Sequence, residues 1–230
     1  MLGIIGAMSQ EVAGLKAQMT EVKVEQLAGM DFYCGKLKGK DVVVVRSGIG
    51  KVNAAICTQI LAGHYGADAV INTGIAGSLK KEINIGDIVL ATDAVQHDMD
   101  ATGFGYPAGQ VPQMDLFAFP ADDKLRELAK KCISKAGLKV GVFCGRVLSG
   151  DQFIDNKEKK EWLSETFGGF CTEMEGAAIA QAAYLNQIPC LIIRAISDKA
   201  DDSANMDYET FEAQAIDHSV RLMLAMAEEW

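Results

Sequence analysis

The chain has 230 residues, of which 49% are hydrophobic, and it carries a formal net charge of −9. This length and hydrophobicity suit one large domain with a full core and exclude a disordered chain, so we expect 1–230 to form a single domain. The negative charge and the lack of a lysine/arginine cluster argue against a nucleic acid or an anionic membrane as partner. A small molecule or another protein fits better.

Three features indicate the compartment and the lack of a cofactor. The apolar run MLGIIGAM is too short for a signal peptide, and no stretch of 18 apolar residues occurs that could span a membrane. The six cysteines form no CxxC pair and lie mostly in apolar segments, which is typical of buried, reduced thiols in a cytoplasmic protein. The three histidines share no metal-ligand spacing, so we expect no metal.

The first 65 residues predict one strand, a hairpin and two helices. The run LGIIGAM at 2–8 is a candidate buried strand, and a helical pattern follows at 10–19. The segment DFYCGKLKGKDVVVVRSG predicts a hairpin that turns at 38–40, with DVVVVRS as its second strand. Apolar residues at 51–65 have the spacing of one helix face.

Strands and helices continue to alternate along the rest of the chain. We expect strands at 67–74, 86–96, 139–150 and 189–197, and helices at 121–136, 156–165, 175–186 and 208–229. Runs such as VVVV and LIIRAI do not alternate with polar residues, which is typical of strands buried on both faces. The order predicts an α/β fold whose largely parallel sheet has helices on both sides. The one long loop, at 97–115, is a candidate lid, interface or mobile segment.

Small and acidic residues follow several of the predicted strands. Ligands of open α/β sheets bind beyond the carboxyl ends of strands, so these residues are candidates for a site. Each one also has a local explanation. Glu11 suits the first turn of a helix, where the macrodipole favours an acid, and Ser197-Asp198 could cap the next segment. Phe153 and Ile154 could be ordinary core residues.

The segment CTEMEGAAIAQAA at 171–183 leaves two interpretations of Glu175 open. Thr172 and Glu175 have the spacing of a capping box on an Ala-rich helix. The wider pattern favours a second interpretation, in which the carboxylates of Glu11, Glu175 and Asp198 follow three different segments and converge near Phe153. Such a set suits cleavage of an N-glycosidic bond, which needs an acid for the leaving group and a base for water.

Eight motifs in order give the chain a family resemblance. GIIGAMSQEV, SGIGKVNAA, NTGIAG, GDIV, FGYPAGQVP, SGDQFI, TEMEGAAIA and RAISDKAD, from residue 2 to about 215, resemble 5′-methylthioadenosine/S-adenosylhomocysteine nucleosidases. The resemblance implies a single three-layer α/β/α domain with a mixed, largely parallel central sheet, usually a homodimer. It also implies hydrolysis of both nucleosides to adenine and the thioribose, as in methionine salvage. The alternatives are a 6-amino-6-deoxyfutalosine hydrolase and a phosphate-dependent purine nucleoside phosphorylase.

The same resemblance implies roles for individual residues. Glu11 would activate water, Asp198 would protonate or hydrogen-bond adenine N7, and Glu175 would bind the ribose 2′- and 3′-hydroxyls. The other implied positions are Met174 beneath the ribose, Phe153 stacked on adenine, Ile154 reading the adenine edge through its backbone, Ser197 and Arg194 as supporting polar groups, Gly77 of the NTGIAG motif at the substrate, Met8, Ile49, Phe104 and Tyr208 around the 5′-alkylthio group, and Ala101, Tyr106 and Pro112 at the neighbouring subunit's site.

Two positions separate this sequence from related patterns. Ile75 stands where the family commonly has a serine near the ribose and the water, and its side chain cannot form hydrogen bonds. Asn72 stands where phosphorylases of the superfamily carry an arginine for phosphate. The lack of that cation disfavours phosphate as the nucleophile.

Overall fold

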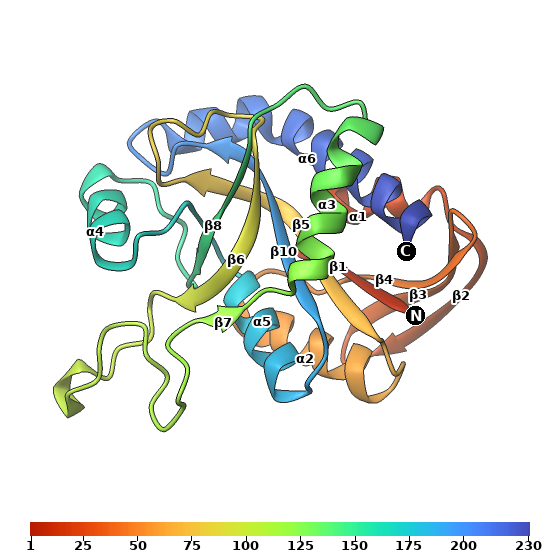
Figure 1. Ribbon diagram of the computed structural model, residues 1–230, viewed down its shortest axis with the longest axis horizontal. Coiled ribbons are helices and arrows are strands. Elements are labelled where there is room, and N and C mark those ends of the chain that lie inside the picture. The colour runs from red at the N-terminus through yellow and green to blue at the C-terminus, as the bar shows by residue number, and fades with distance from the viewer.

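A computed structural model describes residues 1–230 and contains one ten-stranded sheet with helices on both faces (Figure 1). The strands are β1 (Leu2–Gly6), β2 (Thr20–Leu27), β3 (Met30–Leu37), β4 (Lys40–Arg46), β5 (Ala69–Ser78), β6 (Ile88–Gln96), β7 (Phe119–Pro120), β8 (Val142–Ser149), β9 (Cys171–Glu173) and β10 (Cys190–Asp198). The helices are α1 (Ser9–Lys16), α2 (Lys51–Gly63), α3 (Asp123–Lys135), α4 (Lys157–Phe167), α5 (Gly176–Leu185) and α6 (Ala204–Glu229).

The sheet is mixed, and its parallel strands lie in the middle. The strand order is β10-β6-β8-β9-β5-β1-β4-β3-β2, and β10 also pairs with β5, so that β5, β9, β8, β6 and β10 form a closed circuit. β1 runs parallel to β4 and β5, and β10 runs parallel to β5. The β2–β3 and β3–β4 pairings are antiparallel. The carboxyl ends of β1, β5 and β10 therefore meet at one edge.

The non-alternating strands are buried on both faces, as predicted. Val43 and Val45 pack in one core cluster with residues of α2 and α5, whereas Val42 and Val44 pack in the other with residues of α1, α3 and α6. All four valines are fully buried. These two clusters make α2 and α5 one layer and α1, α3 and α6 the opposite layer, with the sheet between them (Figure 1). Complete burial contributes roughly 1.5–3 kcal/mol for each such side chain.

Three strands of the structure, β2, β7 and β9, were not predicted from the sequence. β2 is an edge strand in which charged residues alternate with valines, and seven of its eight residues are exposed. β7 and β9 have only two and three residues, so no period can be detected in them. The predicted helices all form, although α6 begins at Ala204 rather than at residue 208.

The predicted long loop lies between β6 and β7. It contains only the short 3-10 helix η1 (Thr102–Phe104), and it projects from the lower left of the molecule in Figure 1.

None of the helices is both long and apolar enough to cross a membrane. The six cysteines are all unpaired, and four of them are buried.

Candidate active site

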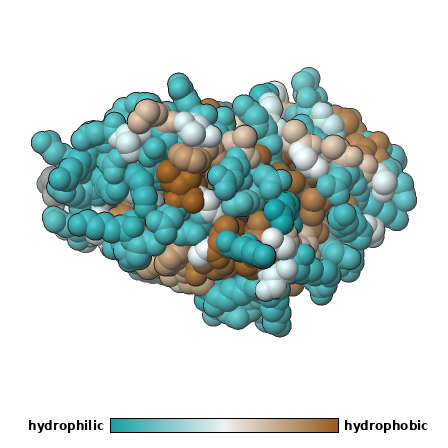
Figure 2. All heavy atoms as spheres, turned by 90° about the horizontal axis from the view of Figure 1, so that it is seen from above, coloured by the Kyte–Doolittle hydropathy of each residue, from teal (hydrophilic) through white to brown (hydrophobic).

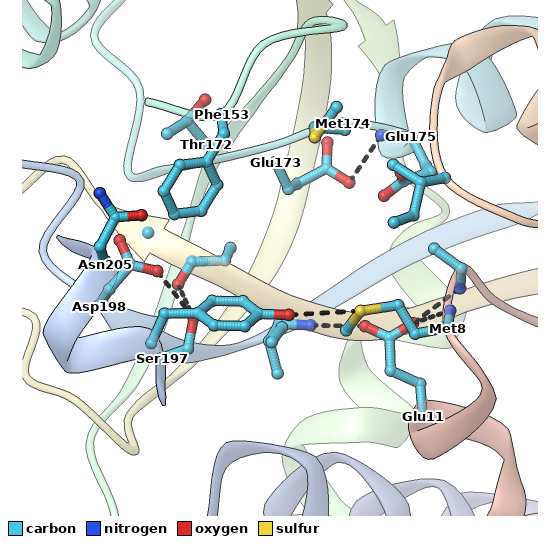
Figure 3. Close-up of a pocket in the computed structure, with 16 residues that line it drawn as sticks. Met8, Glu11, Phe153, Thr172, Glu173, Met174, Glu175, Ser197, Asp198 and Asn205 are labelled. Atoms are coloured by element: carbon cyan, nitrogen blue, oxygen red, sulfur yellow. Dashed lines mark hydrogen bonds between the residues drawn. The ribbon is translucent and has the colours of Figure 1, made fainter. Parts of the chain in front are cut away.

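A cavity of about 320 Å³ opens at the edge of the sheet where β1, β5 and β10 end. Its lining residues are Ala7, Met8, Glu11, Ile49, Ile75, Ala76, Gly77, Phe153, Thr172, Glu173, Met174, Glu175, Ser197, Asp198, Asn205 and Tyr208. The face in Figure 2 is largely hydrophilic, with hydrophobic residues gathered in hollows near its middle. Figure 3 shows Asp198 and Phe153 at one end of the cavity, and Glu11 and Met8 at the other.

Glu11 projects from the first turn of α1 into this cavity and is held by three backbone amides. Its Oε2 accepts hydrogen bonds from Ala7 N at 2.7 Å and Met8 N at 2.9 Å, and its Oε1 accepts one from Ile75 N at 3.2 Å. The carboxylate therefore lies in the first helical turn, as the local interpretation expected, where it also caps the helix and faces the cavity. Burial raises the pKa of Glu11, although Arg194 and the three amides favour the charged form.

Asp198 ends β10 and lies at the opposite end of the cavity. Its Oδ1 accepts a hydrogen bond from Ala200 N at 2.7 Å, and its Oδ2 accepts one from the Ser197 hydroxyl at 2.8 Å. Burial raises the pKa of Asp198 above its usual range, despite these two hydrogen bonds. Asp198 is therefore a carboxyl group that holds a proton more readily than a solvated aspartate does.

Glu175 does not form the capping box that its spacing from Thr172 allowed. Thr172 lies in β9, and its buried hydroxyl has no hydrogen-bond partner in the chain. Glu175 is itself the N-cap residue of α5, and its Oε1 accepts a hydrogen bond from Gly50 N at 2.8 Å. Burial, followed by the neighbouring carboxylate of Glu173, raises the pKa of Glu175 to about 8.

Glu173 takes over the role of capping α5. Its carboxylate accepts hydrogen bonds from Glu175 N at 3.2 Å and Gly176 N at 2.8 Å, and it also accepts one from the Ser149 hydroxyl. It forms a buried ion pair with Arg194, whose Nε lies 3.1 Å from Oε2. Arg194 does not line the cavity, so this predicted site residue lies behind the wall of the cavity and not in it.

Two aromatic residues, Phe153 and Tyr208, line the cavity. Phe153 is 46% exposed, and its ring packs edge-on against Tyr208 with the centroids 6.0 Å apart. The Tyr208 hydroxyl lies 3.3 Å from the Met8 sulfur and donates to Glu212 at 3.1 Å. Ile154 is buried and lines a small adjoining hollow together with Phe153.

Two glycines of the NTGIAG motif allow β5 to approach the acids. A Cβ at Gly77 would lie 2.5 Å from Oδ1 of Asp198, and one at Gly74 would lie 2.6 Å from Oε1 of Glu11. Real Cβ contacts are essentially never this short. At the departure noted at Ile75, the backbone N–H donates to Glu11, and the side chain adds only apolar surface to the cavity wall.

Four predicted residues lie in the long loop and outside the cavity. Phe104 is 89% exposed, and Ala101, Tyr106 and Pro112 are half-buried. None of them lines the cavity of this chain.

Several lining residues were missed from the sequence. Asn205 and Thr172 lie near Asp198 and Phe153 in Figure 3, and Ala7 and Ala76 contribute to the wall. Asn205 lies one residue into α6. Its position could have been noted only from its closeness in sequence to Asp198.

This arrangement joins carboxylates of raised pKa to a partly apolar cavity with an exposed ring. The carboxyls of Glu11 and Asp198 lie at opposite ends, so one can serve as base and the other as acid toward a molecule between them. The exposed face of Phe153 suits a flat heterocycle. A mixed sheet between helical layers, with such a site at its carboxyl edge, defines an α/β enzyme acting on a small molecule with a ring.

Comparisons with known proteins agree with this class. The model of the phosphorylase superfamily matches residues 1–228. A 5′-methylthioadenosine/S-adenosylhomocysteine nucleosidase of Staphylococcus carnosus is 40% identical over 98% of both chains. The crystal structure of such a nucleosidase from Neisseria meningitidis, in complex with methylthio-immucillin-A, is 38% identical in sequence. Its TM-score is 0.95, and the match covers all of this chain and 99% of that one. A futalosine hydrolase of Helicobacter pylori is 33% identical, with a TM-score of 0.94 over all of this chain and 97% of its own.

The chain thus belongs to the phosphorylase superfamily and, within it, to the family of 5′-methylthioadenosine/S-adenosylhomocysteine nucleosidases.

Proposed function

We propose that the protein hydrolyses the N-glycosidic bond of 5′-methylthioadenosine and S-adenosylhomocysteine, releasing adenine and the thioribose. The observation that carries the proposal is the convergence of Glu11, Glu175 and Asp198 on one cavity, next to the exposed ring of Phe153. The names of relatives that are about 40% identical over nearly the whole chain support the same reaction and substrates.

In this proposal Asp198 and Glu11 are the catalytic pair. The buried Asp198 carboxyl gives its proton to adenine N7, or stabilises N7–H as it forms, while the glycosidic bond breaks. Glu11, at the other end of the cavity, accepts a proton from the attacking water. In the transition state, before water has bonded to C1′, the oxocarbenium-like ribose lies between the two groups and is stabilised by the nearby carboxylates. Ser197 supports Asp198 through its hydrogen bond to Oδ2.

The remaining roles concern binding. One oxygen of Glu175 is occupied by Gly50 N, and the other is free to accept hydrogen bonds from the ribose hydroxyls. Met174 packs beneath the sugar, Phe153 stacks on adenine, and the backbones of Ile154 and Gly77 border the base. The apolar side chains of Met8 and Ile49, together with Tyr208, surround the 5′-alkylthio group.

Water rather than phosphate is the proposed nucleophile, because the cavity has no lining arginine or lysine. Asn72 occupies the position of the phosphorylase arginine, and its Nδ2 donates to Ile5 O at 3.0 Å. Arg194 is bound by Glu173 and Asn72 behind the wall. A phosphate would therefore face carboxylates with no cation to bind it.

The test is adenine release in phosphate-free buffer. We expect turnover of 5′-methylthioadenosine without phosphate and no large increase when phosphate is added. Strict dependence on phosphate would make the protein a phosphorylase and contradict the proposal.

A second candidate function is hydrolysis of 6-amino-6-deoxyfutalosine. The specific observation in its favour is the structural match to the H. pylori futalosine hydrolase. Both reactions would use the same carboxylates, so the catalytic groups do not separate the two candidates. Comparing kcat/KM for 6-amino-6-deoxyfutalosine with that for 5′-methylthioadenosine does separate them.

We also propose a cytoplasmic homodimer in which residues 1–230 act as one domain. Exposed apolar side chains gather at the start of α2 and the end of α5, which pack side by side, and include Val52, Ile56 and Leu185. A patch of this kind on packed helices is typical of a protein–protein interface. The loop residues Ala101, Phe104, Tyr106 and Pro112 would then complete the 5′ side of the neighbouring subunit's cavity.

A further inference from the structure

Glu173 is the one buried carboxylate of the cavity wall that has no role in the proposed reaction. It is 8% exposed and ends β9, two residues before Glu175. Every observed contact of its carboxylate is to a hydrogen-bond donor: two backbone amides at the start of α5, the Ser149 hydroxyl and the Arg194 guanidinium. Its hydrogen-bonding capacity is thus used within the protein, which excludes a direct role toward substrate.

The first consequence of these contacts concerns Glu175. Glu173 accepts from the N–H groups of Glu175 and Gly176, while Ser149 Oγ accepts from Ala177 N at 2.7 Å. The unpaired amides at the start of α5 are therefore satisfied without the Glu175 side chain. Glu175 is left free to reach across to Gly50 and the cavity.

The second consequence concerns Arg194 and Glu11. A Cβ at Gly74 would lie 2.6 Å from Oε1 of Glu11 and 3.3 Å from Nη1 of Arg194, so both groups approach the same point of β5. A buried guanidinium this close would form an ion pair with Glu11 and weaken it as a base. Instead, Arg194 directs Nε and Nη2 toward Glu173, Nη2 also contacts Asn72, and Nη1 donates to the Ile193 carbonyl at 3.1 Å.

We propose that Glu173 is a positioning residue, which holds Arg194 away from Glu11 and fixes the backbone from which Glu175 projects. This inference rests on the proposed hydrolysis. It explains why one cation among three buried carboxylates leaves Glu11 able to accept a proton.

No other group near these carboxylates competes with Arg194 as a charge at pH 5–8. The titratable groups facing them are His97, Cys171 and Tyr208. Burial lowers the pKa of His97 to about 4, and burial raises the pKa of Cys171 and of Tyr208 far above neutrality. All three are uncharged in this range, so the charges around Glu11 are those of Arg194, Glu173 and Glu175, and burial raises the pKa of Glu175 to about 8.

The test compares pH profiles of kcat/KM for Glu173→Gln and Ser149→Ala. Glu173→Gln removes the charge that neutralises Arg194, so the acid limb, which reports ionisation of Glu11, should move to lower pH by about one unit. We expect kcat to fall on the order of tenfold, because a weaker base accepts the water proton less well. Ser149→Ala removes a hydrogen bond to Glu173 and one to α5 without changing charge, so its acid limb should stay at the wild-type pH.

An acid limb that is the same in Glu173→Gln, Ser149→Ala and wild type would overturn the inference. If Glu173→Gln does not fold because Arg194 is left unpaired, Arg194→Gln is compared with the double variant Glu173→Gln/Arg194→Gln. In the Arg194→Gln background no guanidinium remains to be held away from Glu11, so removing Glu173 should leave the acid limb unchanged, and a lowered acid limb there would show a direct effect of the Glu173 charge and overturn the inference. A wild-type protein that releases no adenine would instead contradict the proposed function itself, so the two failures are distinguishable.

Discussion

The backbone N–H of Gly50 donates a hydrogen bond of 2.8 Å to Oε1 of Glu175, and so joins the start of α2 to the start of α5. The contact spans 125 residues of sequence. It turns the Glu175 side chain away from its own helix, and it explains why the local capping pattern fails. It also places Ile49, the neighbour of Gly50, on the cavity wall.

Glu175→Gln tests the binding role of this carboxylate. Above the pKa of about 8 to which burial raises Glu175, this carboxyl is ionised, whereas Gln keeps an oxygen for Gly50 N but carries no negative charge beside the ribose at any pH. Because that charge strengthens binding as the sugar becomes cationic, we expect kcat to fall about 10²-fold, with a smaller change in KM. Steady-state kinetics on 5′-methylthioadenosine measure both. A change in KM alone would mean that Glu175 binds ground and transition states equally.

The raised pKa values predict how stability depends on pH. A carboxyl whose pKa is higher in the folded than in the unfolded protein holds more protons when folded, so stability falls as pH rises through the interval. For Glu175 this interval runs from 4.5 to about 8. We expect the Tm of the ligand-free protein to fall from pH 5 to pH 8, and to fall less in Glu175→Gln. Glu209→Gln, at an exposed carboxylate, is the control and should retain the full wild-type slope.

Gly77→Ala should damage the site without replacing any ionisable group. The added Cβ would lie 2.5 Å from Asp198 Oδ1 and 2.8 Å from the Ala200 Cβ, so the acid must move. Overpacking of this kind destabilises by about 1–3 kcal/mol, and we expect kcat to fall at least tenfold. Gly103→Ala is the matched control, because a Cβ there meets nothing within 4 Å. Equal activity of the two variants would contradict the close approach at Gly77.

Leu185→Glu tests the proposed dimer. Leu185 is 63% exposed at the end of α5, and a buried charge at the interface would weaken association. Sedimentation velocity should show a shift from dimer to monomer, and activity should fall with it. Val24→Glu changes a valine that is 54% exposed on edge strand β2, and should leave both unchanged. A wild-type monomer would rule out the dimer.

The sequence predicts the elements whose patterns are local. The VVVV run predicts a strand buried on both faces, and the structure confirms it with two valines on each side of the sheet. β2 could not be found in this way, because a solvated edge strand needs no buried face. The arrangement at Glu173, Glu175 and Arg194 was also out of reach, because it depends on where β9 meets β8, β5 and the start of α5.

Adenine release by wild type and Asp198→Asn, in phosphate-free buffer with 5′-methylthioadenosine, tests the central claim most directly. The amide keeps the shape of the side chain but has no acidic proton to give, so turnover should fall about 10²–10⁴-fold. Binding of a nucleoside analogue, followed by calorimetry, should survive. Wild-type turnover in Asp198→Asn would contradict the assignment of Asp198 as the acid, and no release by either protein would contradict hydrolysis of this nucleoside.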